Sequence, residues 1–171
     1  VRSIYGVNPN GRVGENTHLS WRSPAPWKGK QRLIKFDLTT GEKTTIEPFD
    51  KKGGGIIAPP VNIPEFKMSI AWDSINGGLA GISTIDKQLK VSWHLDVRPS
   101  MQPVVFPESG ELVINNFENG EDELIVVDIA SGELLSQVKV NSKLANGMFL
   151  TPGFSRDIFY CTTGTFSKVT W

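Results

Sequence analysis

Short runs of alternating apolar and polar residues dominate the chain, and they predict β-strands. Segment 134–140 alternates for most of its length, as a strand with one buried face does. Val, Ile, Thr, Phe and Trp recur in such runs, and Gly or Pro separates them at joints such as 53–55, 59–60 and 152–153. The sequence offers no convincing amphipathic helix. The pattern therefore predicts an all-β chain.

One pattern of eleven residues occurs twice, at 32–42 and at 123–133, with five identical positions. Each copy predicts a strand, a turn and a second strand. The Asp of the turn can accept hydrogen bonds from turn amides, and the Gly supplies a positive φ. The copies lie 91 residues apart, about twice the ~40–50 residues of a propeller blade. We therefore expect a further unit between them.

This spacing predicts four units of up to four strands, at about 1–50, 66–98, 101–140 and 146–171. The predicted strands are 2–7, 17–22, 31–38 and 43–49, then 67–72, 78–85 and 88–95, then 102–107, 111–117, 123–129 and 133–140, and last 147–151, 157–162 and 166–171. Stacking such sheets radially buries faces that one sheet alone leaves open. We predict a β-propeller of four-stranded antiparallel blades, with about 3.5–4 blades in this chain.

The fourth predicted unit lacks a last strand, which leaves an open sheet edge. Three explanations are open. Residues 1–7 could close the ring, a second chain could supply the strand and complete the propeller, or the chain belongs to a longer propeller. The second and third make this chain a partial propeller or half-ring.

Two motifs carry a family resemblance. Asp37-x-x-Thr40-Gly41-Glu42 and Asp128-x-x-Ser131-Gly132-Glu133 resemble the repeat core of quinoprotein-like β-propellers (PQQ-type or YVTN-like), and segment 151–171 is similar to the first three strands of such a blade. The resemblance implies a propeller fold. It also implies, as one alternative, an oxidoreductase with its site in the propeller channel.

The sequence departs from the enzymes of that family. Their docking repeat has Ala before the Asp and Trp after the Gly, where this chain has Lys35 and Thr45 in one copy. Cys161 is the only cysteine, so neither a vicinal disulfide nor a Cys-based zinc site can form. We predict no metal site and no cofactor, since neither PQQ nor calcium finds a matching motif.

Charge and hydropathy exclude two classes of partner. The chain has 18 Lys plus Arg against 18 Asp plus Glu, so no basic excess favours nucleic acid. Apolar runs are only a few residues long, so no membrane span is predicted. The lack of paired cysteines fits the cytoplasm as well as the periplasm. We lean slightly towards a periplasmic or secreted protein.

The Pro-rich loop 23–30 is the strongest candidate binding segment. Trp27 lies in it among Arg22, Lys28 and Lys30. An exposed Trp flanked by cations suits a peptide, a sugar or an acidic partner. In the alternative, Trp27 folds back and covers the sheet.

Both histidines, His18 and His94, lie near a Trp in predicted strands. They could point into a channel and bind a ligand or move protons. The alternative is that they are ordinary strand residues, since neither shows the spacing of a metal motif.

Three further features are expected to be structural. Segment 118–123 is acidic, but its Asn119-Gly120 pair predicts a hairpin rather than a calcium loop. Trp93 and Trp171 occupy equivalent repeat positions and are expected to pack between blades. Cys161 is expected to be a buried, inert thiol.

The function favoured by the sequence is a binding or interaction module that acts through loops on one face, with segments 8–16, 23–30 and 50–66 as candidate loops. The ligand, a protein or a small molecule, is not specified. The alternative is a quinoprotein-like enzyme to which this chain contributes part of the site. A third reading is a fragment without a function of its own.

Overall fold

The computed structural model describes residues 3–7, 29–54, 60–142, 147–162 and 164–171. Within them the strands form four antiparallel sheets, and the strands of each sheet follow one another along the chain. Sheet 1 contains β1 (Ser3–Val7), β2 (Leu33–Asp37) and β3 (Lys43–Ile46), and sheet 2 contains β4 (Val61–Ile63), β5 (Met68–Trp72), β6 (Leu79–Ser83) and β7 (Lys90–Leu95). Sheet 3 contains β8 (Val104–Phe106), β9 (Glu111–Glu118), β10 (Glu121–Asp128) and β11 (Leu134–Ser142), and sheet 4 contains β12 (Gly147–Pro152), β13 (Asp157–Thr162) and β14 (Phe166–Thr170).

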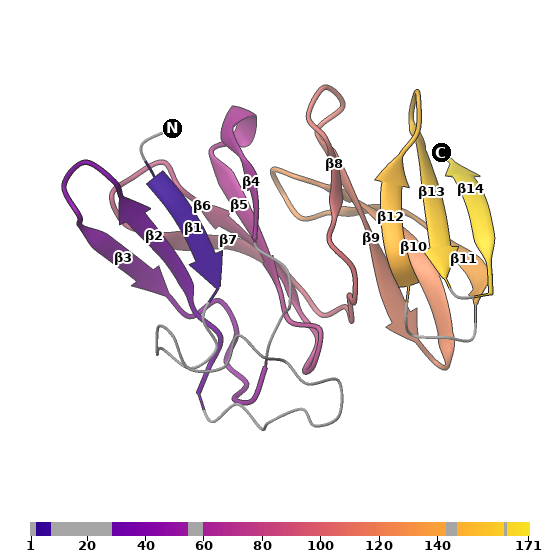
Figure 1. Ribbon diagram of the computed structural model, residues 1–171, viewed down its shortest axis with the longest axis horizontal. Coiled ribbons are helices and arrows are strands. Elements are labelled where there is room, and N and C mark those ends of the chain that lie inside the picture. The colour runs from indigo at the N-terminus through magenta and orange to yellow at the C-terminus, as the bar shows by residue number, and fades with distance from the viewer. Residues whose placement is uncertain (1–2, 8–28, 55–59, 143–146, 163) are drawn as a thin grey trace.

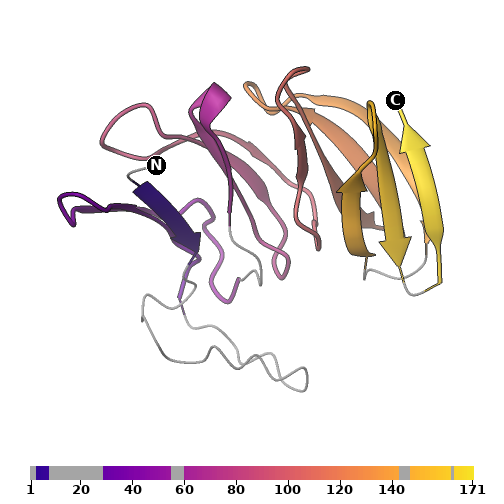
Figure 2. The ribbon, with the colours of Figure 1, turned by 45° about the horizontal axis from the view of Figure 1, so that its top comes forward.

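The four sheets stand in a row in chain order, with sheet 1 at one end and sheet 4 at the other (Figures 1 and 2). Up-and-down antiparallel sheets placed face to face in this way are the consecutive blades of a β-propeller. The predicted fold class is therefore confirmed as an all-β partial propeller. Among the described residues, the two middle sheets have four strands and the two end sheets have three. No helix in these residues is long and apolar enough to cross a membrane.

Each pair of neighbouring sheets shares an apolar core. Sheets 1 and 2 bury Leu33, Phe49, Ala71, Ala80, Ile82 and Leu89 between them. Sheets 2 and 3 bury Ile63, Met68, Ile70, Trp72, Leu79, Trp93, Leu112, Ile114, Ile125, Val127 and Ile129. Sheets 3 and 4 bury Met101, Val113, Leu124, Val126, Val140, Ile158 and Tyr160. Both faces of sheets 2 and 3 are thus covered, so strands such as β5 are buried along their whole length.

The core between sheets 2 and 3 is built around the indole of Trp93. Its Nε1–H donates to the Ile129 carbonyl at 2.9 Å, which links β7 to the end of β10. Two glycines leave room for the ring. A Cβ would lie 2.2 Å from the indole at Gly81 and 2.6 Å from it at Gly132. The glycine of the second repeat motif therefore serves both its own turn and the packing of sheet 3 against sheet 2.

The repeated motif forms one turn geometry, and a third copy occurs at Asp73. In each copy the Asp carbonyl accepts from the Gly four residues later, at 2.8 Å from Gly41, 3.0 Å from Gly77 and 2.9 Å from Gly132. The Asp carboxylate also accepts from turn amides. These glycines have φ of 75°, 82° and 76°, the region that favours glycine. The third copy joins β5 to β6.

Most predicted strands are observed, and the differences have physical causes. Residues 3–7 pair with β2 inside sheet 1, so in this structure they are not the last strand of the fourth unit, which was one of the three open explanations. Segment 50–66, predicted as a loop, contains β4 and the 3-10 helix η1 (Pro64–Phe66). β4 has three residues, too few for an alternating pattern. The predicted strand 17–22 and loop 8–16 lie outside the described residues.

Trp93 and Trp171 both pack between sheets, as predicted, but their positions are not equivalent. Trp93 lies in the fourth strand of sheet 2, whereas Trp171 follows the third strand of sheet 4. Their indoles approach sheet 3 from opposite sides, one at Ile129 and the other at Glu111. The predicted hairpin at 119–120 is confirmed, with φ of 53° at Asn119 and 81° at Gly120.

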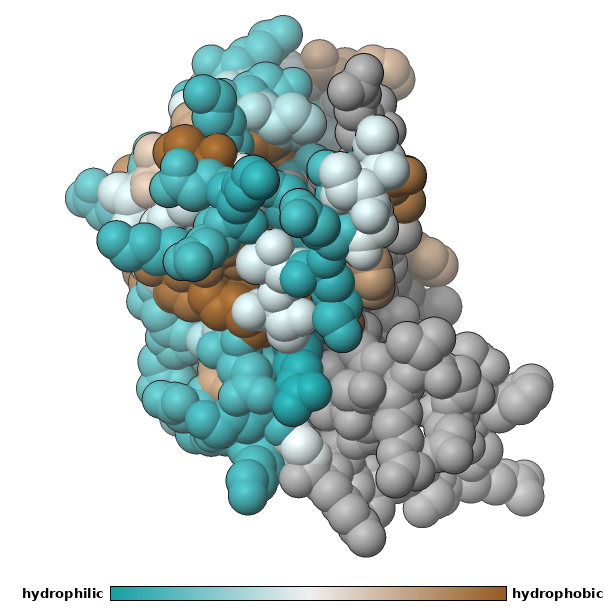
Figure 3. Space-filling model, turned by 90° about the vertical axis from the view of Figure 1, so that its left-hand side faces the viewer, coloured by the Kyte–Doolittle hydropathy of each residue, from teal (hydrophilic) through white to brown (hydrophobic). Residues whose placement is uncertain are grey.

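The two end sheets each turn one face away from the row. In sheet 1, alternation places Ile34 and Phe36 on the side opposite Leu33, and both are half-buried. Figure 3 views the molecule from this end and shows apolar residues gathered between polar ones. In sheet 4, Phe149 and Phe166 are exposed.

We predict that Gly81→Ala destabilises the chain by roughly 1–3 kcal/mol, because a methyl group at this site forces the Trp93 indole out of its place. Urea unfolding followed by circular dichroism measures the loss. Gly164→Ala is the matched control, since nothing lies within 4 Å of a Cβ there. Equal stability of the two variants would contradict the role given to the indole.

Candidate functional site

An open pocket of about 420 Å³ lies where sheets 1 and 2 meet. It is lined by Pro48, Phe49, Asp50, Lys51, Gly77, His94 and Asp96. These residues come from the segment after β3, the turn between β5 and β6, and the end of β7. We refer to this site as the His94 pocket.

A buried aromatic ring forms the base of the His94 pocket. Phe49 is only 5% exposed and packs in the core between sheets 1 and 2. Its ring meets the imidazole of His94 edge to face, with 5.6 Å between centroids. Gly78 makes this contact possible, because a Cβ there would lie 2.8 Å from the Phe49 ring and 3.2 Å from His94 Nε2. His94 itself is exposed.

Charged side chains of both signs surround the pocket. Lys30 Nζ donates to Asp50 at 3.1 Å, and Lys51 Nζ donates to the Asn76 carbonyl at 3.4 Å. The Lys30 segment is held beside the pocket by pairing with Lys52. Asp96 lies two residues beyond His94, so both side chains leave the chain on the same side. The lining residues thus combine an imidazole, two carboxylates and one ammonium.

The structure brings two of the predicted site residues to the same place. His94 lines the pocket, and Lys30 contacts Asp50, which also lines it. Arg22, Trp27, Lys28 and His18 lie outside the described residues, so their roles stay predictions. Sequence reasoning missed Phe49, Asp50 and Asp96. Only the His-x-Asp spacing at 94–96 offered a signal, since alternate strand residues share a face.

The pocket is suited to binding through hydrogen bonds and charge. Ser, Thr and Cys are absent from the described residues that line it. In the part of the chain that the structure describes, no three His, Cys, Asp or Glu side chains come together to hold a metal ion. The described lining residues can form hydrogen bonds and ion pairs with a polar ligand beside the aromatic ring of Phe49.

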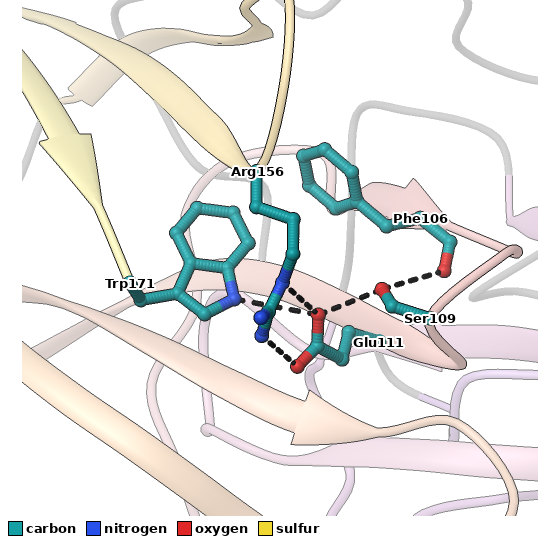
Figure 4. A network of polar contacts seen from close by, with 5 residues as sticks. All are labelled: Phe106, Ser109, Glu111, Arg156 and Trp171. Atoms are coloured by element: carbon teal, nitrogen blue, oxygen red, sulfur yellow. Dashed lines mark hydrogen bonds and ion pairs between the residues drawn. The ribbon is translucent and has the colours of Figure 1, made fainter.

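A second polar cluster joins sheets 3 and 4 around Glu111 (Figure 4). The carboxylate accepts from Arg156 Nε at 3.1 Å and Nη2 at 2.5 Å, and from Ser109 Oγ at 2.7 Å. The indole N–H of Trp171 donates to it at 3.4 Å. Burial alone raises the pKa of Glu111, but these hydrogen bonds and the guanidinium charge outweigh it and lower the pKa. This network of hydrogen bonds links sheet 3 to sheet 4.

The carboxyl group of Asp122 is fully buried between the same sheets. It accepts from the Tyr160 hydroxyl at 2.6 Å and from Asn115 Nδ2 at 3.0 Å. Burial raises the pKa of Asp122 despite these bonds. A perturbed carboxyl can mark a functional site. Here the side chain is enclosed by core residues and has no access to a ligand, so we assign it to packing.

Cys161 differs from its prediction in burial. The thiol is half-buried rather than buried, because alternation in β13 turns it away from sheet 3 with Phe159. Its Sγ lies 3.8 Å from the Thr162 carbonyl oxygen.

No family model matches the chain, and no curated protein matches it. Solved structures do match. A europium-containing methanol dehydrogenase is 10% identical over 64% of this chain and 21% of its own, with a TM-score of 0.42. A chain of a nidogen/laminin complex is 17% identical over 77% and 49%, with a TM-score of 0.49. The β-propeller domain of the Trilobed protease from Pyrococcus furiosus is 13% identical over 83% and 49%, with a TM-score of 0.43.

This chain therefore spans between about a fifth and a half of the length of these matched structures. The order of the sheets and the packing between them define the architecture of this chain.

We predict that Arg156→Gln destabilises the chain by about 1–3 kcal/mol at neutral pH, because the buried Glu111 carboxylate loses its guanidinium. Arg32→Gln is the matched control. It removes an ion pair with Glu47 in which both side chains are more than a third exposed, and it should cost less than about 0.5 kcal/mol.

The pH dependence of the Arg156→Gln effect follows from the lowered pKa of Glu111. Because the pKa of Glu111 is lower in the folded chain than its usual value of 4.5, the ionised carboxylate stabilises the fold at pH values above 4.5. This stabilisation is lost as the pH falls through the pKa of Glu111 in the folded chain. Urea unfolding at neutral pH and at about pH 3 should show the difference between wild type and variant shrinking on acidification. A difference that is constant with pH would contradict the assignment.

Proposed function

We propose that this chain is part of a β-propeller binding module whose ligand site is the His94 pocket. The observation that carries the proposal is the contact between the exposed imidazole of His94 and the buried ring of Phe49, in a pocket that Asp50 and Asp96 also line. Three segments that are distant in the sequence, 48–51, 77 and 94–96, meet there. Propellers use connecting segments in this way, because the stacked sheets hold them rigidly.

The carboxylate of Asp96 is the group in the pocket that suits a cationic group of a ligand. Asp50 also lines the pocket, but it already accepts from Lys30 at 3.1 Å. A guanidinium or ammonium can donate to a carboxylate while its stem lies against an aromatic ring. The Lys51 side chain points its ammonium towards the Asn76 carbonyl. An arginine or lysine side chain of a bound peptide fits this chemistry.

The surroundings of His94 also favour a role for its imidazole in binding. The edge contact with Phe49 fixes one side of the His94 ring, while the exposed side keeps its hydrogen-bonding capacity. A fixed ring loses less conformational freedom on binding than a mobile one, and so contributes more to affinity. Because the pocket is open and small, we expect weak affinity for an isolated peptide.

We predict that a capped Gly-Arg-Gly peptide, added to about 10 mM, shifts the amide signals of 48–51, 77 and 94–96 in a nitrogen–proton correlation spectrum. A capped Gly-Glu-Gly peptide is the matched anionic control and should leave them unchanged. Asp96→Asn should weaken the response to the arginine peptide several-fold, because a charge-assisted hydrogen bond becomes a neutral one. Equal shifts with both peptides, or shifts confined to other residues, would overturn the proposal.

A further inference from the structure

The imidazole of His94 is held in place on one side and open to solvent on the other. Phe49 meets the ring edge to face at 5.6 Å between centroids, and a Cβ at Gly78 would lie only 3.2 Å from Nε2. The residue itself is exposed. Histidine is the side chain that ordinarily gains a proton, and with it a positive charge, between about pH 8 and pH 5. A proton taken up by this ring therefore adds a charge to the pocket itself.

The segment after β3 brings two charged side chains to the pocket, and both have partners. Asp50 accepts from Lys30 Nζ at 3.1 Å, so these two charges offset each other. Lys51 Nζ donates to the Asn76 carbonyl at 3.4 Å. Neither ammonium is therefore left to compete for the remaining carboxylate of the pocket.

The other elements around His94 contribute two more carboxylates. In the turn between β5 and β6, Asp73 is fully buried and accepts from the amides of 75 and 76, each at 2.9 Å. On β6 the residue that pairs with His94 is the uncharged Ala80. Asp96, beyond the end of β7, is exposed and leaves the chain on the same side as His94. Within the described residues, no ion pair holds the Asp96 carboxylate.

A positive charge on His94 changes the electrostatics of the pocket in two ways that have the same sign. It attracts the Asp96 carboxylate, which is the group that suits a cationic ligand. It also repels the ligand's own cation. Repulsion between unit charges about 6 Å apart weakens binding about threefold even at the dielectric constant of water, and more strongly beside a protein surface.

Protonation also removes a hydrogen-bond acceptor. A neutral imidazole has one nitrogen that accepts a hydrogen bond and one that donates, whereas the protonated ring only donates. A guanidinium or an ammonium also only donates. The neutral ring of His94 can therefore accept from a cationic ligand, and the protonated ring has nothing to offer it. This loss adds to the electrostatic effect.

We propose that protonation of His94 releases the cationic ligand, so that the His94 pocket binds it near neutral pH and releases it in a mildly acidic medium. This inference rests on the proposed function, since it concerns the regulation of the same site. Coupling between two binding events is reciprocal. A bound cation must therefore make His94 harder to protonate by the same factor by which the proton weakens binding of the cation.

The first test compares the affinity of the capped Gly-Arg-Gly peptide at about pH 7.5 and about pH 5.5, at one ionic strength, from the amide shifts of 48–51, 77 and 94–96. The dissociation constant should be at least about threefold higher at the lower pH. A peptide with citrulline in place of arginine is the matched control. It has nearly the same shape but no charge, so its dissociation constant should change less. Unchanged amide signals of β10 at the two pH values verify that the fold is the same.

The variant His94→Gln separates this histidine from every other titrating group. Glutamine keeps a hydrogen-bond acceptor but takes up no proton in this range. Whatever its affinity at about pH 7.5, the ratio of the two dissociation constants should fall close to one. A second measurement needs no binding by the variant. The Cε1 proton signal of His94, assigned by its absence from the variant, is followed against pH. Its midpoint should move to lower pH when the peptide is present.

The outcomes distinguish this inference from the proposed function. Binding at about pH 7.5 that is equally strong or stronger at about pH 5.5 would overturn the inference and leave the binding site standing. The same holds if His94→Gln keeps the full pH dependence, or if the peptide leaves the midpoint of the His94 signal where it was. Absence of binding at both pH values would overturn the proposed function, and the inference with it.

Discussion

Face-to-face packing between neighbouring sheets is the constraint on which the rest of this structure depends. A sheet of three or four strands has two faces, and it becomes stable when something covers them. Alternation in β5 sends Ile70 towards sheet 3 and Ala71 towards sheet 1, so one strand serves two cores. Each buried Ile, Leu or Val contributes about 1.5–3 kcal/mol. Residues on facing sheets therefore stabilise each other, and no sheet is independent of its neighbour.

Polar contacts fix how the sheets meet once the apolar faces have brought them together. Each interface has its own: Gln31 Nε2 donates to the Trp72 carbonyl at 3.0 Å between sheets 1 and 2, and Trp93 donates to Ile129 between sheets 2 and 3. Between sheets 3 and 4 the polar contact is the ion pair of Glu111 with Arg156. Apolar contact is tolerant of sliding, whereas directed hydrogen bonds are not. The same rigidity holds the segments around the His94 pocket in place.

The repeat motif allowed much of this fold to be predicted, because a turn is a local structure. Asp37 and Asp128 bond to amides within a few residues, so their neighbours in sequence are their partners in space. The third copy at Asp73 escaped notice because Asn76 replaces Thr or Ser before the glycine. β4 escaped because three residues show no period. Both failures come from short or altered patterns.

The candidate site was much less predictable, because its residues come together only through the stacking of sheets. His94 could be selected by its chemistry, but nothing in the sequence placed Phe49 against it, 45 positions earlier. Glu111 and Arg156 are also 45 residues apart. Pairing of this kind depends on which face of which sheet meets which neighbour.

Native-state hydrogen exchange across a urea series tests the dependence of each sheet on its neighbour most directly. It would compare the amides of Ile70 in sheet 2 and Ile125 in sheet 3, which lie in the same core. The account predicts that both amides exchange with one opening free energy, equal to that of global unfolding, and with the same dependence on urea. If one sheet opens at a clearly lower free energy while the other stays protected, the sheets are independent units and the central claim is wrong.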